Sequence, residues 1–179
     1  ATAGLAMSGA FAQSDYPRKP VKLVTPYAAG GAVDIMGRAI AKELAEFMGQ
    51  SVIVENKGGA GGALAAAEVA RTEPDGHTIF IGATGPLAIA PAMYAKVNFD
   101  PIKDFTAISL IATTPYVLVT NPGLPVKSVA ELIAHARQNP GRLNFASAGT
   151  GGPDHLAGEL FRQMAGIQTV HVPYKGAGP

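Results

Sequence analysis

The chain has 179 residues, of which 47% are hydrophobic and 15% are charged, with a formal net charge of +1. This length is enough for one ordinary core or two small lobes. The balanced charge gives no electrostatic basis for binding nucleic acid or an anionic membrane. Because cysteine is absent, disulfides, thiolate metal sites and thiol nucleophiles are excluded, although an oxidising compartment is still compatible with this composition.

The N-terminal segment resembles a processed export signal. Residues 1–12 are small and apolar and contain no charge, and Ala10-Phe11-Ala12 has the A-x-A form of a signal-peptidase site. We interpret residues 1–12 as a signal-peptide remnant, with the mature protein starting at Gln13; a disordered alanine-rich terminus is the alternative. No later segment approaches the length of a transmembrane helix, so we expect an exported protein without direct membrane insertion.

A strand, a glycine turn and a helix follow one another early in the chain. Residues 21–24 predict a buried strand, Gly30 and Gly31 a tight turn, and residues 33–48 a helix with one apolar face. Glycines at such a turn leave the backbone N–H groups at the positive end of the helix dipole open to a ligand. The pattern therefore favours binding of a small anion.

The alternation of strands and helices continues to about residue 105. The predicted elements are a strand at 52–55, a glycine loop at 56–62, an alanine-rich helix at 63–71, a strand at 78–81 and a short helix at 87–94. Because parallel strands place their binding loops at their carboxyl ends, we expect the loop with Thr84 to lie beside residues 27–31. The Thr84 hydroxyl could contact a ligand or satisfy the local backbone.

The alternation breaks after Thr106. Apolar residues at 108–111 and 116–119 predict two consecutive strands without a helix between them. We expect such a break where a chain crosses into another lobe. A hinge near Thr106 therefore divides the chain into a first lobe at residues 13–108 and a second lobe at residues 109–179.

The second lobe repeats the arrangement of the first. Ser128 with Glu131 three residues later forms a capping-box pattern at the start of a helix that runs to about Gln138. The elements that follow are a strand at 143–146, a second glycine loop at 147–155, a helix that ends at about residue 165 and a strand at 169–172. Two anion-binding loops on separate lobes could close on one ligand from opposite sides.

Common cofactor motifs are absent. A G-x-G-x-x-G pattern begun at Gly59 ends on Leu64, one begun at Gly149 ends on Asp154, and the chain has no G-K-[ST] sequence. The spacing of the four histidines does not provide a metal site. We therefore expect neither a cofactor nor a metal.

Five short motifs, most of them rich in glycine, follow one another from about Tyr16 to the end of the chain. They are P-Y-A-A-G-G-A-V-D at 26–34, E-N-K-G-G-A-G-G at 55–62, P-D-G-H-T at 74–78, S-A-G-T-G-G-P-D-H-L at 147–156 and V-P-Y-K-G at 172–176. In order and spacing they resemble the substrate-binding receptors of tripartite tricarboxylate transporters, also called Bordetella uptake gene proteins.

The resemblance implies an α/β type II periplasmic-binding-protein fold, with two α/β lobes joined by a hinge. It implies a periplasmic solute-binding protein without catalytic activity, which captures a small carboxylate such as a di- or tricarboxylate, an amino acid or an aromatic acid. The expected partners are that ligand and the membrane permease subunits of the transporter, and we expect a monomer. Family members are considerably longer, so a C-terminally truncated chain with an incomplete second lobe is also implied.

Carried over to this sequence, the resemblance places the ligand between the loops at 27–34 and 147–155, held by backbone N–H groups, hydroxyls and waters. The predicted ligand-binding residues are Tyr27, Ala28, Gly30, Gly31, Asp34, Thr84, Ser147, Thr150, Gly151 and His155. For Asp34 we predict a bond to a backbone N–H and a pair with Arg38, with a ligand amine or hydroxyl as the alternative. For His155 a structural role at the helix start is the alternative.

Two other functions fit the same residues. An exported α/β hydrolase could use Ser147 or Thr150 as nucleophile with His155 as base, although no motif supplies a third group to orient that base. A carboxylate sensor would have the same ligand site as a transport receptor. Turnover of esters would favour the hydrolase, and neighbouring permease genes would favour the receptor.

Overall fold

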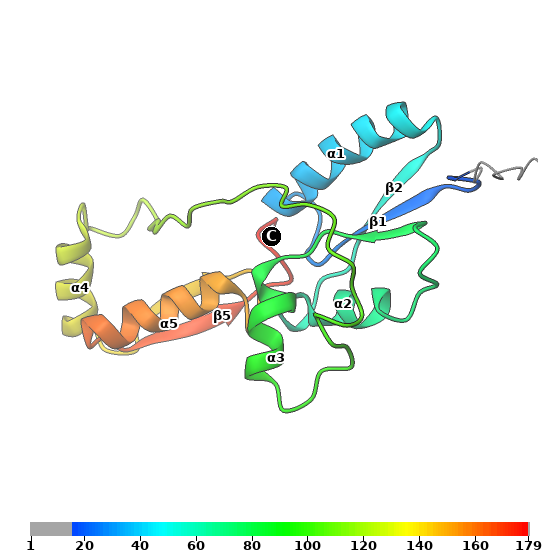
Figure 1. Cartoon of the computed structure of the whole chain (residues 1–179). Helices are drawn as coiled ribbons and strands as arrows, with labels where there is room; N and C mark the ends of the chain where they lie inside the picture. Colours follow the sequence, from blue (N-terminus) through cyan, green and yellow to red (C-terminus); the bar gives the residue numbers. More distant parts are fainter. Residues whose placement is uncertain (1–15, 179) are drawn as a thin grey trace, which may run out of the picture.

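The computed structural model describes residues 16–178, so the signal-peptide interpretation of residues 1–12 lies outside the described part. Its elements, in chain order, are β1 (Val21–Thr25), α1 (Ala32–Met48), β2 (Val52–Asn56), η1 (Ala60–Gly62), α2 (Ala63–Val69), β3 (Thr78–Phe80), η2 (Gly85–Ile89), α3 (Ala90–Met93), α4 (Val129–Gln138), β4 (Leu143–Ser147), α5 (Pro153–Ala165) and β5 (Thr169–Pro173) (Figure 1). No helix within residues 16–178 is long and apolar enough to span a bilayer.

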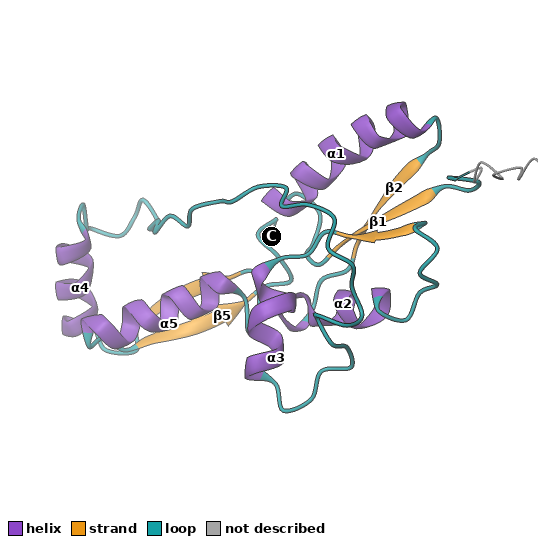
Figure 2. Cartoon of the chain, viewed as in Figure 1, coloured by secondary structure: helices purple, strands orange, loops and turns teal. Residues whose placement is uncertain are grey.

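The first half of the chain forms a parallel three-stranded sheet in the order β2-β1-β3 (Figure 2). Its central strand β1 is buried on both faces, and successive side chains point to opposite sides. Leu23 packs with Ala41 of α1, whereas Val24 packs with Ala65 and Val69 of α2. The small side chains of α2 let that helix approach the sheet closely, since Ala65 is fully buried.

The second half contains a two-stranded parallel sheet, β4 and β5, with α5 connecting the strands. Ala136 of α4, Ala165 of α5 and Ile167 form its buried core. The guanidinium of Arg137 donates to the Ala165 carbonyl at 3.2 and 2.6 Å, which satisfies an acceptor at the C-terminal end of α5. The capping-box prediction at the start of α4 is confirmed, because Ser128 Oγ accepts from the Glu131 N–H at 3.2 Å.

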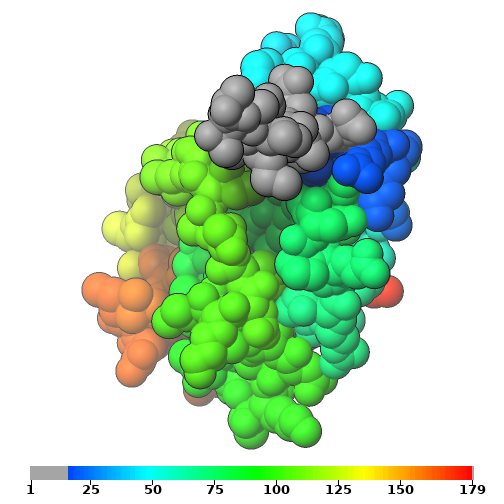
Figure 3. Space-filling view, turned by 45° about the vertical axis from the view of Figure 1, so that its right-hand side comes forward, coloured from blue at the N-terminus to red at the C-terminus, as the bar shows by residue number. Residues whose placement is uncertain are grey.

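The two strands predicted after Thr106 are wrong. Residues 106–121 form no strand, and every one of them is exposed, including Leu110 at 81% and Val119 at 79%. The space-filling view shows this lime-green connector on the surface, beside the teal residues of the first half (Figure 3). An apolar run becomes a strand only when a second strand satisfies its N–H and C=O groups, and within residues 16–178 none does so. The lobe boundary at residue 108 stays a prediction.

The two halves meet through their glycine loops. The Ala28 N–H donates to the Lys175 carbonyl at 2.9 Å, and the Tyr94 hydroxyl donates to the Thr150 carbonyl at 3.2 Å. A Cβ atom on Gly61 would lie 2.8 Å from the Thr150 carbonyl oxygen, so only glycine permits this approach. In Figure 1 the C-terminal residues run back from β5 to the start of α1.

Candidate ligand-binding site

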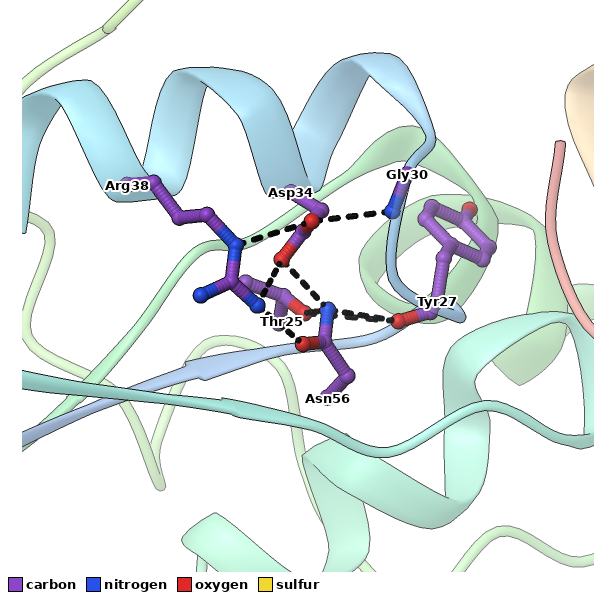
Figure 4. Close-up of polar contacts among 6 residues, drawn as sticks. All are labelled: Thr25, Tyr27, Gly30, Asp34, Arg38 and Asn56. Carbon is purple, nitrogen blue, oxygen red and sulfur yellow. Dashed lines mark hydrogen bonds and ion pairs between the residues drawn. The ribbon is translucent and has the colours of Figure 1, made fainter. Parts of the chain in front are cut away.

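A buried carboxylate organises the first loop (Figure 4). Asp34, which is 4% exposed, lies in the first turn of α1 and accepts the Gly30 N–H at 2.9 Å. It also accepts hydrogen bonds from Arg38 Nε at 3.0 Å and from Asn56 Nδ2 at 2.9 Å, and its Oδ1 forms an ion pair with Arg38 Nη2 at 3.0 Å. The predicted backbone bond of Asp34 and its pair with Arg38 are confirmed.

The environment of Asp34 favours its charged form strongly. The hydrogen bond from Arg38 and that from the Gly30 N–H lower the pKa of Asp34 to about 2, against an opposing contribution from burial. Both carboxylate oxygens therefore carry bonds to protein donors at neutral pH. Asp34 acts on the loop by fixing the bend at Gly30, whose φ is +86°.

Asn56 is a site residue that the sequence reasoning missed. Its amide lies at the carboxyl end of β2, and it donates to Thr25 Oγ1 at 2.7 Å and to the Tyr27 carbonyl at 3.1 Å in addition to Asp34. Its Oδ1 accepts from Arg38 at 3.2 Å. These contacts join the end of β1, the first loop and α1 into one network. The signal for Asn56 was its place in the E-N-K-G-G motif directly after a strand.

Tyr27 presents a protonated hydroxyl at the meeting of the two halves. Burial raises the pKa of Tyr27 to about 12, and the charges of nearby Tyr116 and Asp154 act in the same direction. A Cβ on Gly85 would lie 2.6 Å from the Tyr27 hydroxyl, which confirms that the loop with Thr84 lies beside the first glycine turn. Tyr116 comes from the exposed connector, and no motif pointed to it.

The second loop uses a similar internal carboxylate. Asp154, in the first turn of α5, accepts the Ala148 N–H, and Ser147 Oγ accepts the Gly149 N–H at 3.2 Å. Each loop is thus held by an acid from the helix that follows it. An acid in the first helical turn also interacts favourably with the helix dipole.

Two histidines complete the second loop. Ser147 Oγ lies 2.6 Å from His171 Nε2 on the neighbouring strand β5, and the Gly151 N–H donates to His155 Nδ1 at 3.2 Å. The two imidazoles stack with their centroids 4.1 Å apart, and Phe145 stacks on His171 at 4.8 Å. Burial lowers the pKa of His171, and the neighbouring His155 acts in the same direction, whereas Glu159 and Asp154 oppose it.

Several backbone N–H groups that were predicted to bind the ligand instead donate hydrogen bonds within the protein. The N–H groups of Ala28, Gly30 and Gly151 donate to Lys175, Asp34 and His155 respectively. However, the N-cap residues of α1 and α5 are Gly31 and Gly152, which have no side chain to cap these helices. The first-turn N–H groups of the two helices therefore receive no hydrogen bond from a capping side chain, and Pro153 at the start of α5 has no N–H.

The remaining predicted residues lie at the same junction. Thr84 and Thr150 are exposed, and Thr84 precedes η2 without a side-chain hydrogen bond to it. Gly31 is buried and is the N-cap residue directly before α1. The ligand-binding roles of all these residues stay predictions.

The hydrolase alternative loses its proposed geometry. Ser147 pairs with His171, and His155 Nδ1 is occupied by the Gly151 N–H. Thr150 contributes its carbonyl to Tyr94. Among residues 16–178, no group of His, Asp and Glu side chains is arranged to hold a metal ion.

A family model described as "Tripartite tricarboxylate transporter family receptor" matches residues 36–179. The chain belongs to this receptor family. Its relatives include the UPF0065 protein in the tcbD-tcbE intergenic region of a Pseudomonas species, which is 40% identical over 164 residues, 92% of this chain and 48% of the relative. Protein BugT of Bordetella pertussis is 35% identical over 180 residues, 100% of this chain and 55% of the relative.

Solved receptor structures have the same fold. Rpa4515 of R. palustris, solved with adipate, is 41% identical and superposes with a TM-score of 0.86, covering 90% of this chain and 54% of that protein. MatC of Rhodopseudomonas palustris, solved with bound malate, is 35% identical with a TM-score of 0.85, over 92% and 56% of the two chains. The α/β periplasmic-binding-protein fold is therefore confirmed.

This member of the receptor family spans about half the length of the curated relatives it matches. The family and its solved structures, among them the periplasmic binding protein BugD, comprise solute-binding proteins and not enzymes. This agrees with the loss of the hydrolase geometry at Ser147.

Proposed function

We propose that this chain is the carboxylate-capturing part of a periplasmic receptor, which delivers its ligand to the membrane permease of a tripartite transporter. The observation that carries the proposal is the pair of uncapped helix starts, at α1 and α5, on the two sides of one loop junction. Two helix N-termini supply N–H donors and positive potential to one anion. Charge-assisted bonds of this kind hold a carboxylate without an arginine.

The Tyr27 hydroxyl adds a donor to this junction. With a pKa of about 12 it stays protonated at neutral pH, so it can donate to a carboxylate oxygen. The exposed Thr84 hydroxyl lies on the neighbouring loop. The relatives solved with adipate and with malate support a small carboxylate as the ligand class.

A thermal-shift titration tests the proposal. We would titrate the chain with adipate, malate, citrate, an amino acid and an aromatic acid, because a ligand at a thousandfold excess over its Kd stabilises the folded state by about 4 kcal/mol. Tyr27→Phe removes one hydroxyl at the junction and should reduce the shift. Tyr16→Phe, whose hydroxyl bonds the distant Gly76 carbonyl, is the matched control and should leave the ligand-induced shift unchanged.

A shift with one acid that Tyr27→Phe reduces and Tyr16→Phe preserves would support the proposal. The absence of any shift across the panel, in a folded and ligand-free sample, would overturn carboxylate capture by this chain. An equal reduction of the ligand-induced thermal shift in Tyr27→Phe and Tyr16→Phe would show that Tyr27 has no specific role in binding.

A further inference from the structure

The contact between Gly151 and His155 fixes the protonation of that imidazole. Gly151 N donates its only hydrogen to His155 Nδ1 at 3.2 Å. The accepting nitrogen must carry a lone pair, so His155 is neutral and holds its proton on Nε2. The ring of His171 stacks on that of His155, with the centroids 4.1 Å apart.

This arrangement competes with an anion. The Nδ1 lone pair of His155 occupies the Gly151 N–H and presents partial negative charge to any carboxylate that approaches it. Addition of a proton to Nδ1 removes the acceptor and creates a second donor. The Gly151 N–H and the His155 Nδ1–H would then both be free to donate to one carboxylate, in a charge-assisted arrangement.

We propose that His155 and Gly151 couple carboxylate capture at the second loop to the uptake of one proton. The inference rests on the proposed function, and it adds that binding of the carboxylate is accompanied by protonation of His155. In the step, a proton from solvent binds Nδ1, the Gly151 N–H···Nδ1 hydrogen bond breaks, and the Gly151 N–H and the new Nδ1–H each donate a hydrogen bond to the carboxylate. No other bond changes, and the net charge of protein and ligand rises by one.

The groups around His155 restrict the uptake to one proton. On α5, Asp154 and Glu159 carry negative charge, and Arg162 pairs with Glu159 at 2.6 Å. On β5, burial and the neighbouring His155 lower the pKa of His171. The uncharged Ser147 comes from β4. The phenols that approach Asp154 from the first loop and the connector are Tyr27 and Tyr116, and both have raised pKa values.

An NMR titration tests the proposal without the natural ligand. We would follow the His155 ring nitrogens and the Gly151 amide from pH 8 to pH 5, with sodium acetate or sodium chloride at equal ionic strength. We expect the Nε2–H tautomer at pH 8, a Gly151 amide shift with the same midpoint as His155, and a midpoint about one pH unit higher in acetate. A shift of one unit corresponds to a tenfold preference of the anion for the protonated ring.

The Gly30 amide is an internal control, because its acceptor Asp34 has a pKa of about 2 and keeps its charge over this range. His135→Gln changes a histidine on α4 outside the loop and should leave the His155 midpoint unchanged in both salts. A midpoint equal in acetate and chloride, or a Gly151 amide that does not follow His155, would overturn the proposal.

Calorimetry with adipate and malate extends the test to larger ligands. In buffers of different ionisation heat, at a pH midway between the His155 midpoints of the free and the bound protein, we expect uptake of about half a proton per carboxylate bound, and no uptake in His155→Gln. The affinity should fall by about tenfold in total as the pH rises from below the midpoint of the free protein to above that of the bound protein. Binding without proton uptake would overturn the proton coupling alone. Absence of binding would count against the proposed function, and the acetate titration would still decide the coupling.

Discussion

The internal carboxylate of the first loop makes a strong quantitative prediction. Asp34→Asn keeps the size of the side chain but removes the charge that Arg38, Asn56 and the Gly30 N–H bind. The fall of the Asp34 pKa from its usual 3.8 to about 2 corresponds to about 2 kcal/mol of folding free energy. Removal of one partner of a buried ion pair costs about 3–5 kcal/mol. Because the Arg38 side chain is 56% exposed and can be rehydrated, we expect a loss of about 2–3 kcal/mol.

Urea unfolding of the wild-type chain and of Asp34→Asn at pH 7 measures this loss. The urea concentration at the unfolding midpoint should fall, while the dependence of the unfolding free energy on urea concentration stays the same. Glu43→Gln is the matched control, because Glu43 is exposed on the same helix, and we expect a change within about 0.5 kcal/mol. The pH dependence is a second check. Since the folded-state pKa of Asp34 is depressed, its contribution is fully present above about pH 4 and is lost as the pH falls through about 2.

The reasoning would be refuted if Asp34→Asn unfolded at the same urea concentration as Glu43→Gln. It would also be refuted if the difference between the wild-type chain and Asp34→Asn stayed constant as the pH fell from 5 to 2. Either result would mean that the Asp34 carboxylate contributes to the loop geometry without stabilising the fold.

Two further predictions concern the loop junction. Gly61→Ala should destabilise the chain by about 1–3 kcal/mol more than Gly49→Ala, because both glycines have positive φ but only the Gly61 methyl would meet the Thr150 carbonyl, at 2.8 Å; equal urea midpoints for the two variants would contradict this contact. An alkaline absorbance titration of the wild-type chain and of Tyr27→Phe should differ by one phenol. Because burial raises the pKa of Tyr27 to about 12, that phenol should titrate near pH 12. The stability that the buried Tyr27 hydroxyl contributes is fully present below pH 10 and is lost as the pH rises through about 12. If the phenol that is absent from Tyr27→Phe titrated at pH 10 in the wild-type chain, Tyr27 would be exposed to solvent.

Much of the local structure follows from the sequence alone. The predicted helices at 33–48 and 63–71 match α1 and α2 to within two residues, because apolar spacing and glycine stops act over a single turn. The Asp34 and Arg38 pair is equally local, since residues four apart share a helix face. The order of the glycine motifs was also sufficient to identify the receptor family.

Contacts between distant residues were not predictable in this way. Asn56 reaches Asp34 across 22 residues and Thr25 across 31, and Ser147 meets His171 across 24. Each pairing depends on the register of parallel strands, which no short window of sequence specifies. In the hydrolase hypothesis Ser147 was therefore paired with His155, whose ring accepts the Gly151 N–H instead.

The connector shows the same division between local preference and tertiary context. Its apolar residues favour strands, yet residues 106–121 form no strand and are exposed. Local sequence determined where strands, turns and helices could form. The tertiary structure decided which strands found hydrogen-bonding partners and which loop N–H groups were already bound, because a hydrogen bond needs both of its partners in place.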